Sequence, residues 1–187
     1  MSKILIVVDM QNDFITGALG TAEAQAIIPA VNAKIRQYLD NGDVVVYTRD
    51  THYDNYMDTD EGKHLPVPHC IQYSDGWQIA DAVIREEGSC VVDKETFGCF
   101  DLPECILEWY GYDGATGEVV HIDSIELVGL CTDICVISNA LLFKAFCTNS
   151  QFAIPIKVDA KCCAGVTPES HAAAIATMKM CQIEVEE

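Results

Sequence analysis

Several segments of this sequence are apolar at nearly every position, where a half-buried strand would be apolar at alternate positions. They include KILIVVD (3–9), DVVVYTRD (43–50) and SIELVGLC (124–131). A strand of this kind is buried on both faces, which is typical of parallel sheets. These segments alternate with stretches of helical spacing, such as 22–42 and 167–180. The alternation predicts parallel β-α-β units and a doubly wound α/β sheet.

The remaining segments follow the same alternation. Strands are also expected at 89–95 and 151–159, and helices at 77–88, 102–111 and 132–147. Residues 183–187 either add a sixth strand or fray. Thr167 is expected to cap the last helix, with Pro168 as its first residue. The stretch 51–74 shows no periodicity, and loops of this length are often functional. Because no linker or repeat divides the chain, we expect one domain over residues 1–187.

The charge balance restricts the partners of this chain. It has 11 basic and 29 acidic residues, a formal net charge of -18, which repels phosphate backbones and anionic lipid surfaces. We therefore expect neither a nucleic acid nor a membrane as partner. The sequence shows no secretory signal pattern and no apolar run long enough for a membrane span, so a cytoplasmic location is expected. The first strand is followed by DMQNDFITGALG, without the glycine fingerprint of dinucleotide-binding folds, so no nucleotide cofactor is expected.

Chemically active residues follow several of the expected strands. Asp9 ends the first strand, Asp50 the second and Lys94 the third, while Cys135 follows the fourth. Ligands of open α/β sheets bind beyond the carboxyl ends of the strands, so these side chains are expected to share one crevice. Cys135 is expected in the first turn of its helix, where free N–H groups and the helix dipole favour a thiolate. A carboxylate that accepts the thiol proton and an ammonium that stabilises the resulting anion would complete a catalytic set.

Three motifs resemble the isochorismatase-like cysteine hydrolases, a family that includes the nicotinamidases. They are DMQNDF (9–14), DKETFGCF (93–100) and GLCTDICV (129–136), in the order the family has them. The resemblance implies a three-layer α/β/α fold with a mostly parallel six-stranded sheet. It also implies a catalytic triad of Asp9, Lys94 and Cys135, and favours a homo-oligomer.

The chemistry that the resemblance implies is hydrolysis of the carbon–nitrogen bond of a small amide. Asp9 would take the proton of Cys135, the thiolate would attack the amide carbonyl, and water would hydrolyse the resulting thioester. The leading candidate reaction is nicotinamide to nicotinate. The family also has a cis peptide before the nucleophile, here between Leu130 and Cys131. That turn would direct the N–H groups of Cys131 and Cys135 at the oxyanion.

Nicotinamidases of the family bind a divalent metal through D-x-H and later histidines. The corresponding residues here are Asp50, His52 and His69, with Asp58 where a further histidine is found in relatives. Such side chains are good ligands for zinc, iron or manganese. Two interpretations stay open: a metal site, or loop residues that only cap helices and bond to the backbone.

The expected substrate pocket differs from that of nicotinamidases. Where these have a tryptophan before the P-x-H-C segment, this sequence reads HLPVPHC, with Leu65 in place of the aromatic ring. Phe14 and Trp77 are candidates to supply a ring from elsewhere. Together with Leu65 and with Phe97 and Phe100 of the lysine motif, they are expected to bind the substrate. The sequence therefore supports hydrolysis of an amide better than it supports nicotinamide as the particular amide.

Two other functions stay open. One is isochorismate-type vinyl ether hydrolysis on the same fold, which in relatives does not depend on the cysteine, so that the intact Cys135 argues against it. The other is a non-enzymatic, thiol-rich redox or metal-holding domain, suggested by the ten cysteines. The absence of any C-x-x-C pair argues against that domain and against a zinc finger. We expect most of the thiols to be reduced and buried.

Overall fold

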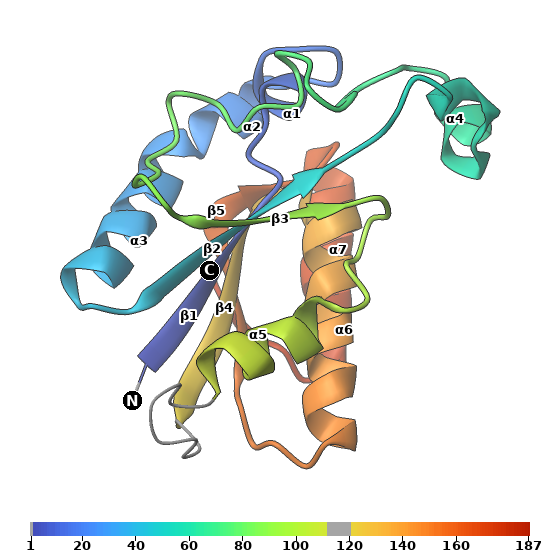
Figure 1. Cartoon of the computed structure of the whole chain (residues 1–187). Coiled ribbons are helices and arrows are strands. Elements are labelled where there is room, and N and C mark those ends of the chain that lie inside the picture. The colour runs from blue at the N-terminus through green and yellow to red at the C-terminus, as the bar shows by residue number, and fades with distance from the viewer. Residues whose placement is uncertain (1, 112–120) are drawn as a thin grey trace.

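The computed structural model describes residues 2–111 and 121–187. Its centre is a six-stranded parallel sheet in the order β3-β2-β1-β4-β5-β6 (Figure 1). The strands are β1 (Ser2–Val8), β2 (Val44–Asp50), β3 (Cys90–Lys94), β4 (Ile122–Leu130), β5 (Ile156–Ala164) and β6 (Glu184–Glu186). The predicted doubly wound α/β fold is confirmed, and all the described strand pairs are parallel.

Helices cover both faces of this sheet (Figure 1). They are α1 (Asn12–Ile15), α2 (Ala22–Ala26), α3 (Ile28–Asp40), α4 (Asp60–His64), α5 (Leu102–Tyr110), α6 (Ile137–Asn149) and α7 (Pro168–Met180). Short helical turns occur at η1 (Tyr56–Asp58) and η2 (Thr132–Val136). The first three helices pack on one face and α5 to α7 on the other. Within residues 2–111 and 121–187, no helix has both the length and the apolar character needed to cross a membrane.

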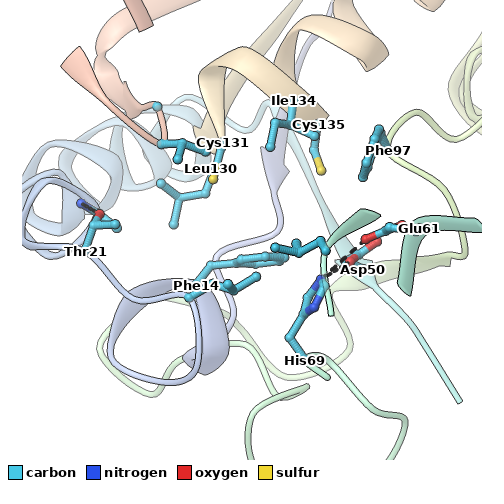
Figure 2. Close-up of a pocket in the computed structure, with 15 residues that line it drawn as sticks. Phe14, Thr21, Asp50, Glu61, His69, Phe97, Leu130, Cys131, Ile134 and Cys135 are labelled. Carbon is cyan, nitrogen blue, oxygen red and sulfur yellow. Dashed lines mark hydrogen bonds and ion pairs between the residues drawn. The ribbon is translucent and has the colours of Figure 1, made fainter. Parts of the chain in front are cut away.

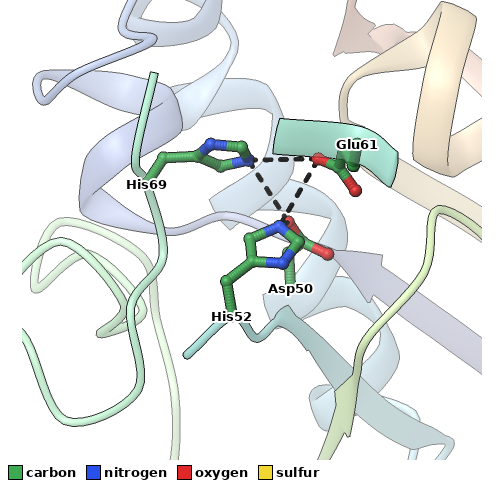
Figure 3. A group of neighbouring side chains, drawn as sticks. All are labelled: Asp50, His52, Glu61 and His69. Atoms are coloured by element: carbon green, nitrogen blue, oxygen red, sulfur yellow. Dashed lines mark ion pairs between the residues drawn. The ribbon is translucent and has the colours of Figure 1, made fainter. Parts of the chain in front are cut away.

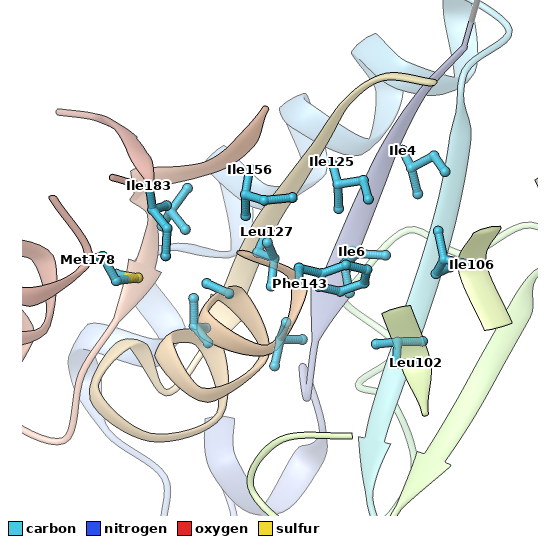
Figure 4. Packing of buried hydrophobic residues seen from close by; sticks show 14 of the residues in the cluster. Ile4, Ile6, Leu102, Ile106, Ile125, Leu127, Phe143, Ile156, Met178 and Ile183 are labelled. Atoms are coloured by element: carbon cyan, nitrogen blue, oxygen red, sulfur yellow. The ribbon is translucent and has the colours of Figure 1, made fainter. Parts of the chain in front are cut away.

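The two hydrophobic cores explain why the central strands are apolar at every position. On β1, Leu5 belongs to the core beneath α3, whereas the adjacent Ile4 and Ile6 belong to the core beneath α5 and α6. Figure 4 shows Ile4 and Ile6 in the second core, together with Leu102 of α5 and Phe143 of α6. All five side chains are at most 1% exposed. Successive residues of a strand point to opposite faces, so a sheet covered on both sides needs apolar residues throughout.

The order of the strands reverses at β1. The chain runs outward from β1 through β2 to β3, then returns to the other side of β1 and continues from β4 to β6. Such a reversal leaves a crevice at the carboxyl ends of the two strands that flank it, here β1 and β4. The two strands are very close there, because a Cβ at Gly129 would clash with the carbonyl of Val8. Gly129 also has φ of 115°, so that both the space and the backbone angle require glycine.

The helix predicted at 77–88 does not form. Most of its apolar residues are buried, but the backbone pairs with the segment after β1: Ala80 N donates to Met10 O, and Asn12 N donates to Gln78 O. Trp77 and Ile79 pack in the core beneath α3 without helical geometry. The spacing of the apolar residues therefore indicated which side chains are buried, but it did not indicate a helix.

Two other predicted boundaries differ from the structure. The helix expected at 22–42 is divided at Ile27, because the ring of Pro29 is accommodated in the first turn of a new helix. The strand expected at 151–159 begins later and continues to Ala164. Asp159 lies inside that strand because Lys34 Nζ, 2.8 Å from its carboxylate and 3.0 Å from that of Glu126, compensates the buried charges.

Candidate functional site

The three side chains predicted as a triad meet at the carboxyl end of the sheet. Lys94 Nζ, at the end of β3, lies 2.7 Å from Asp9 Oδ2 and 3.6 Å from Cys135 Sγ. Asp9 follows β1, and Cys135 lies in the turn that follows β4. All three residues are at most 4% exposed. A carboxylate, an ammonium and a thiol in direct contact away from water can exchange protons with one another.

Burial and charge determine how these groups ionise. Burial raises the pKa of Asp9, an effect that the nearby Lys94 opposes. Burial also raises the pKa of Cys135 well above that of an ordinary thiol; Lys94 lowers it, whereas the charge and hydrogen bond of Asp9 raise it further. Burial alone would lower the pKa of Lys94, but Asp9, Cys135 and Asp50 hold it well above its ordinary value. The arrangement is therefore a charged lysine beside a protonated thiol that needs a base.

Thr48 supports the candidate base. Its hydroxyl donates to Asp9 Oδ1 at 2.6 Å, and Asp9 N donates to the same Oγ1 at 3.3 Å. Asp9 itself has φ of 48°, an uncommon backbone angle for an aspartate. These contacts direct one carboxylate oxygen at Thr48 and leave Oδ2 facing Lys94.

The turn between β4 and α6 presents the thiol. The peptide bond between Leu130 and Cys131 is cis, as the resemblance implies. The following residues, Thr132–Val136, form a π-helical turn that continues into α6. Cys131 O accepts hydrogen bonds from Ile134 N at 3.1 Å and Val136 N at 3.0 Å. Cys135 therefore lies at the start of the helical segment, as predicted.

A group of four possible metal ligands lies beside the lysine. Asp50, His52 and His69, which the sequence singled out, are joined by Glu61 from α4 (Figure 3). Asp50 Oδ2 lies 2.9 Å from His52 Nε2 and 3.6 Å from His69 Nε2. Glu61 Oε1 lies 3.5 Å from His52 Nε2 and 3.6 Å from His69 Nε2. The donor atoms thus converge on one small volume, as the ligands of an ion do.

The bonding of these residues fits a metal site. His69 Nδ1 lies 2.8 Å from Val67 O, which directs the other ring nitrogen, Nε2, into the group. His52 Nε2 is buried and, among the described residues, makes no aligned hydrogen bond despite its short distance to Asp50. Burial lowers the pKa of His52, but the adjacent carboxylates outweigh this effect and raise it to about 9. Two imidazoles and two carboxylates suit zinc, iron or manganese.

Glu61 is a residue that the sequence did not identify. Asp58, considered there for a fourth ligand, is exposed and stands outside the group. Glu61 lies on α4, a short helix within the aperiodic stretch 51–74. No spacing rule places a residue of such a helix next to the ligands that follow a strand, so only the tertiary structure could reveal it.

We expect that Glu61→Ala weakens metal binding. The substitution removes one of four converging ligands, and losing such a group lowers affinity at least about tenfold. The dissociation constant of zinc, measured by competition with a chromogenic chelator, tests this expectation. Asp58→Ala is the matched control, since it removes an exposed acid from the same segment. Equal affinities in the two variants would exclude Glu61 as a ligand.

The DMQNDF motif holds the metal-ligand group in place. Gln11 Nε2 donates to Asp50 O at 2.8 Å and to Trp77 O at 2.9 Å, while Gln11 Oε1 accepts from Asp50 N at 2.7 Å. Asp13 Oδ2 accepts from the N–H of Cys70, the residue after His69, at 2.8 Å. The motif thus supplies the candidate base and also positions two of the four ligands.

An apolar pocket of about 300 Å³ opens onto Cys135 and the metal-ligand group (Figure 2). Its apolar walls include Phe14, Leu19, Leu65, Phe97, Leu130 and Ile134. Asp50, Glu61 and His69 line one side, and no lysine or arginine is among the described residues that line it.

Three of the five residues predicted to bind substrate line this pocket: Phe14, Leu65 and Phe97. Trp77 and Phe100 are not among its lining residues. Trp77 is 5% exposed; its Nε1 donates to Thr51 Oγ1 at 2.9 Å, and the Arg49 guanidinium stacks on its ring. Phe100 is 80% exposed. Trp77 is therefore part of the scaffold beneath β2, and neither residue is in contact with the candidate pocket.

Comparison with known proteins identifies the family. A sequence profile of the isochorismatase domain matches residues 3–186. This chain belongs to the isochorismatase family. Among curated members, the nicotinamidase/pyrazinamidase of Mycobacterium tuberculosis is 25% identical over 195 residues, 98% of this chain and 97% of that protein. The parallel fold and the nicotinamidase-like motifs thus place the chain among isochorismatase-like hydrolases.

Solved structures of the family superpose along the whole chain. A zinc complex of pyrazinamidase from Pyrococcus horikoshii is similar with a TM-score of 0.78 and 28% identity, covering 100% of this chain and 99% of that one. N-carbamoylsarcosine amidase from Thermoplasma acidophilum is similar with a TM-score of 0.76 and 26% identity, covering 100% and 96%. The similar solved structures thus include a pyrazinamidase and an N-carbamoylsarcosine amidase.

Proposed function

We propose that this protein is a cysteine amidohydrolase that cleaves the carbon–nitrogen bond of a small, uncharged amide. The observation that carries the proposal is the buried contact of Lys94 with both Asp9 and Cys135 at the base of an apolar pocket. Similarity to a nicotinamidase/pyrazinamidase and to an amidase supports it. Nicotinamide is the leading substrate candidate.

The proposed reaction begins with proton transfer from Cys135 Sγ to Asp9. Lys94 stabilises the thiolate by charge as it forms, and the sulfur then attacks the amide carbon. The N–H groups of Cys131 and Cys135 stabilise the tetrahedral oxyanion. Asp9 returns its proton to the amide nitrogen, ammonia leaves, and a thioester remains. Water, activated by Asp9, hydrolyses that thioester to release the acid and restore the thiol.

Asp50, His52, Glu61 and His69 would hold a divalent metal next to these groups. When bound, such an ion supplies Lewis-acid chemistry and a positive charge that can orient a polar atom of the substrate or the water. Asp50 also reaches the triad directly, since its Oδ1 lies 3.0 Å from Lys94 Nζ. One carboxylate therefore belongs to both parts of the site.

The pocket favours an uncharged acyl group. Its walls are apolar apart from Thr21, the cysteines and the metal-ligand side, and its charged lining residues Asp50 and Glu61 are acidic. A carboxylate on the substrate would find no basic side chain among the described lining residues. This argues against carbamoyl amino acids and against isochorismate, which carries two carboxylates. Leu65 contributes an apolar side chain to the wall but has no flat ring on which an aromatic acyl group could stack.

Ammonia release from matched amides tests the proposal. We expect turnover of nicotinamide, pyrazinamide or benzamide, and at least about tenfold lower kcat/KM for N-carbamoylsarcosine, because its carboxylate would be desolvated among apolar walls with no basic side chain among the described lining residues. Protein of known metal content is used throughout. A higher kcat/KM for the carboxylate-bearing compound would contradict the proposed substrate class. If none of the amides is hydrolysed, the proposed amidohydrolase activity is contradicted.

The thiol-rich binding domain is less well supported than the enzyme. All ten cysteines are free, and the structure places Cys135 against a buried lysine and aspartate, which a redox scaffold does not require. A single domain over residues 1–187, a cytoplasmic location and a homo-oligomeric state remain parts of the proposal that await measurement.

A further inference from the structure

A buried asparagine connects the nucleophile turn to the segment that follows the lysine strand. Asn139, on the first turn of α6, is 0% exposed. Its Nδ2 donates to Cys135 O at 2.8 Å and to Phe97 O at 3.2 Å. Its Oδ1 accepts from Cys99 N at 2.9 Å. One side chain thus bonds to the backbone of the candidate nucleophile and to two residues of the 95–99 segment.

The 95–99 segment is pressed closely against α6 at this point. Gly98 lies between the two residues that Asn139 binds, and a Cβ at Gly98 would lie 2.7 Å from Leu142 Cδ1 and 3.2 Å from Ser138 Cβ. The segment begins directly after Lys94, and the side chain of Phe97 forms one wall of the pocket (Figure 2). Phe97 is 45% exposed, so side-chain packing alone holds it weakly. The backbone bonds of Asn139 therefore account for much of its placement.

We propose that Asn139 is a positioning residue that sets the distance between the Phe97 wall and Cys135, and so contributes to selection of the acyl group. The inference rests on the proposed function, in which that pocket receives the acyl group. Asn139 touches neither substrate nor reacting atoms; it acts through Phe97 and the carbonyl of Cys135. Loss of its bonds to the 95–99 segment would leave the thiol in place but loosen the wall beside it.

Alkylation of Cys135 tests this role without requiring a known substrate. The rates of its reaction with N-benzyl iodoacetamide and with iodoacetamide are followed by peptide mass spectrometry, with the exposed Cys181 as internal reference. For each cysteine we take the ratio of the alkylation rate with N-benzyl iodoacetamide to the rate with iodoacetamide. In the native protein we expect this ratio to be higher at Cys135 than at Cys181, because the apolar pocket binds the benzyl ring. The ratio of the two rates, and not either rate alone, measures how well the Phe97 wall binds the ring.

Asn139→Ser separates the two contacts of the asparagine. A serine hydroxyl can still bond to the carbonyl four residues earlier, that of Cys135, but cannot reach the 95–99 segment. We expect the ratio at Cys135 to fall about tenfold, since a displacement of the order of 1 Å is costly in a shaped site. Asn139→Asp is the second variant: it keeps the acceptor for Cys99 N but replaces the donor toward Phe97 and Cys135.

Asn32→Ser is the matched control. Asn32 also joins a helix to a loop by two backbone bonds, to Ala82 O at 2.8 Å and from Ile84 N at 2.9 Å, away from the pocket. Its substitution should lower stability without changing the ratio at Cys135.

A cycle with Phe97→Ala shows whether Asn139 acts through the wall. We expect Phe97→Ala to lower the ratio, and Asn139→Ser to lower it no further in that background. Additive effects, or an unchanged ratio in both Asn139 variants, would overturn the inference. An equal ratio at Cys135 and Cys181 in the native protein would overturn it too, because the pocket would then not distinguish the benzyl reagent from the small one. If these ratios behave as expected but no amide is hydrolysed, the proposed function fails while the positioning role stands.

Discussion

Replacing Cys135 with alanine is expected to abolish amide hydrolysis while the fold remains intact. No other described thiol is hydrogen-bonded to Lys94, so no substitute nucleophile is available beside the lysine. Loss of a covalent nucleophile costs at least about 10³-fold in kcat, because base and oxyanion donors then have nothing to activate. Ammonia release under single-turnover conditions measures the remaining rate.

Cys181→Ala provides the control for this experiment. Cys181 is exposed and follows α7, so its loss should leave turnover unchanged. Thermal unfolding should show that both variants remain folded, since Cys135 is a small side chain whose replacement by alanine leaves only a small cavity. Substantial turnover in folded Cys135→Ala would mean that the thiol is not the nucleophile.

Asp9→Asn is expected to reduce hydrolysis strongly but to make Cys135 easier to ionise. An amide cannot take the thiol proton or return it to the leaving nitrogen, so kcat/KM should fall about 10²- to 10⁴-fold. The pKa of Cys135 should move down, because the charge and hydrogen bond of Asp9 raise it and Lys94 lowers it. The pH dependence of alkylation measures that pKa separately from turnover.

If Asp9 is the general base, Asp9→Asn must lower kcat/KM for hydrolysis and at the same time lower the pKa of Cys135. Asp93→Asn is the control, because Asp93 is an exposed carboxylate on β3, next to Lys94 in the sequence and bonded to Arg49. Unchanged hydrolysis in Asp9→Asn would assign the proton transfer to another group. A rise in the pKa of Cys135 would show that Asp9 does not raise that pKa in the native protein.

The sequence predicted those parts of the fold that depend on local pattern. Fully apolar segments gave the strands of the parallel sheet, and Thr167 caps α7 as expected, accepting from Ser170 N. The strand ends also indicated the site, because parallel strands bring their carboxyl ends to one edge. That reasoning selected Asp9, Lys94 and Cys135, which the structure brings into contact.

The features that the sequence did not predict depend on tertiary contacts. Trp77 lies in a stretch with helical spacing, yet it occupies a turn whose neighbouring residues pair with the segment after β1. Glu61 reaches the metal-ligand group from a helix of five residues in an aperiodic loop. Asn139 looks like an ordinary polar residue of an apolar helix, because its partners lie on another segment. A local sequence pattern does not show which segments, distant in sequence, will contact one another in the folded protein.

The reversal of strand order at β1 has a consequence for how the site comes into existence during folding. Asp9, Lys94 and the four possible metal ligands all belong to the part of the chain that ends with β3, whereas Cys135 arrives with β4. The thiol meets its base only when β4 pairs with β1, a contact between segments distant in sequence. Closing so long a loop is entropically unfavourable and typically late. A nascent chain can therefore assemble the half that contains Asp9, Lys94 and the possible metal ligands first, and it adds the thiol of Cys135 only when β4 joins the sheet.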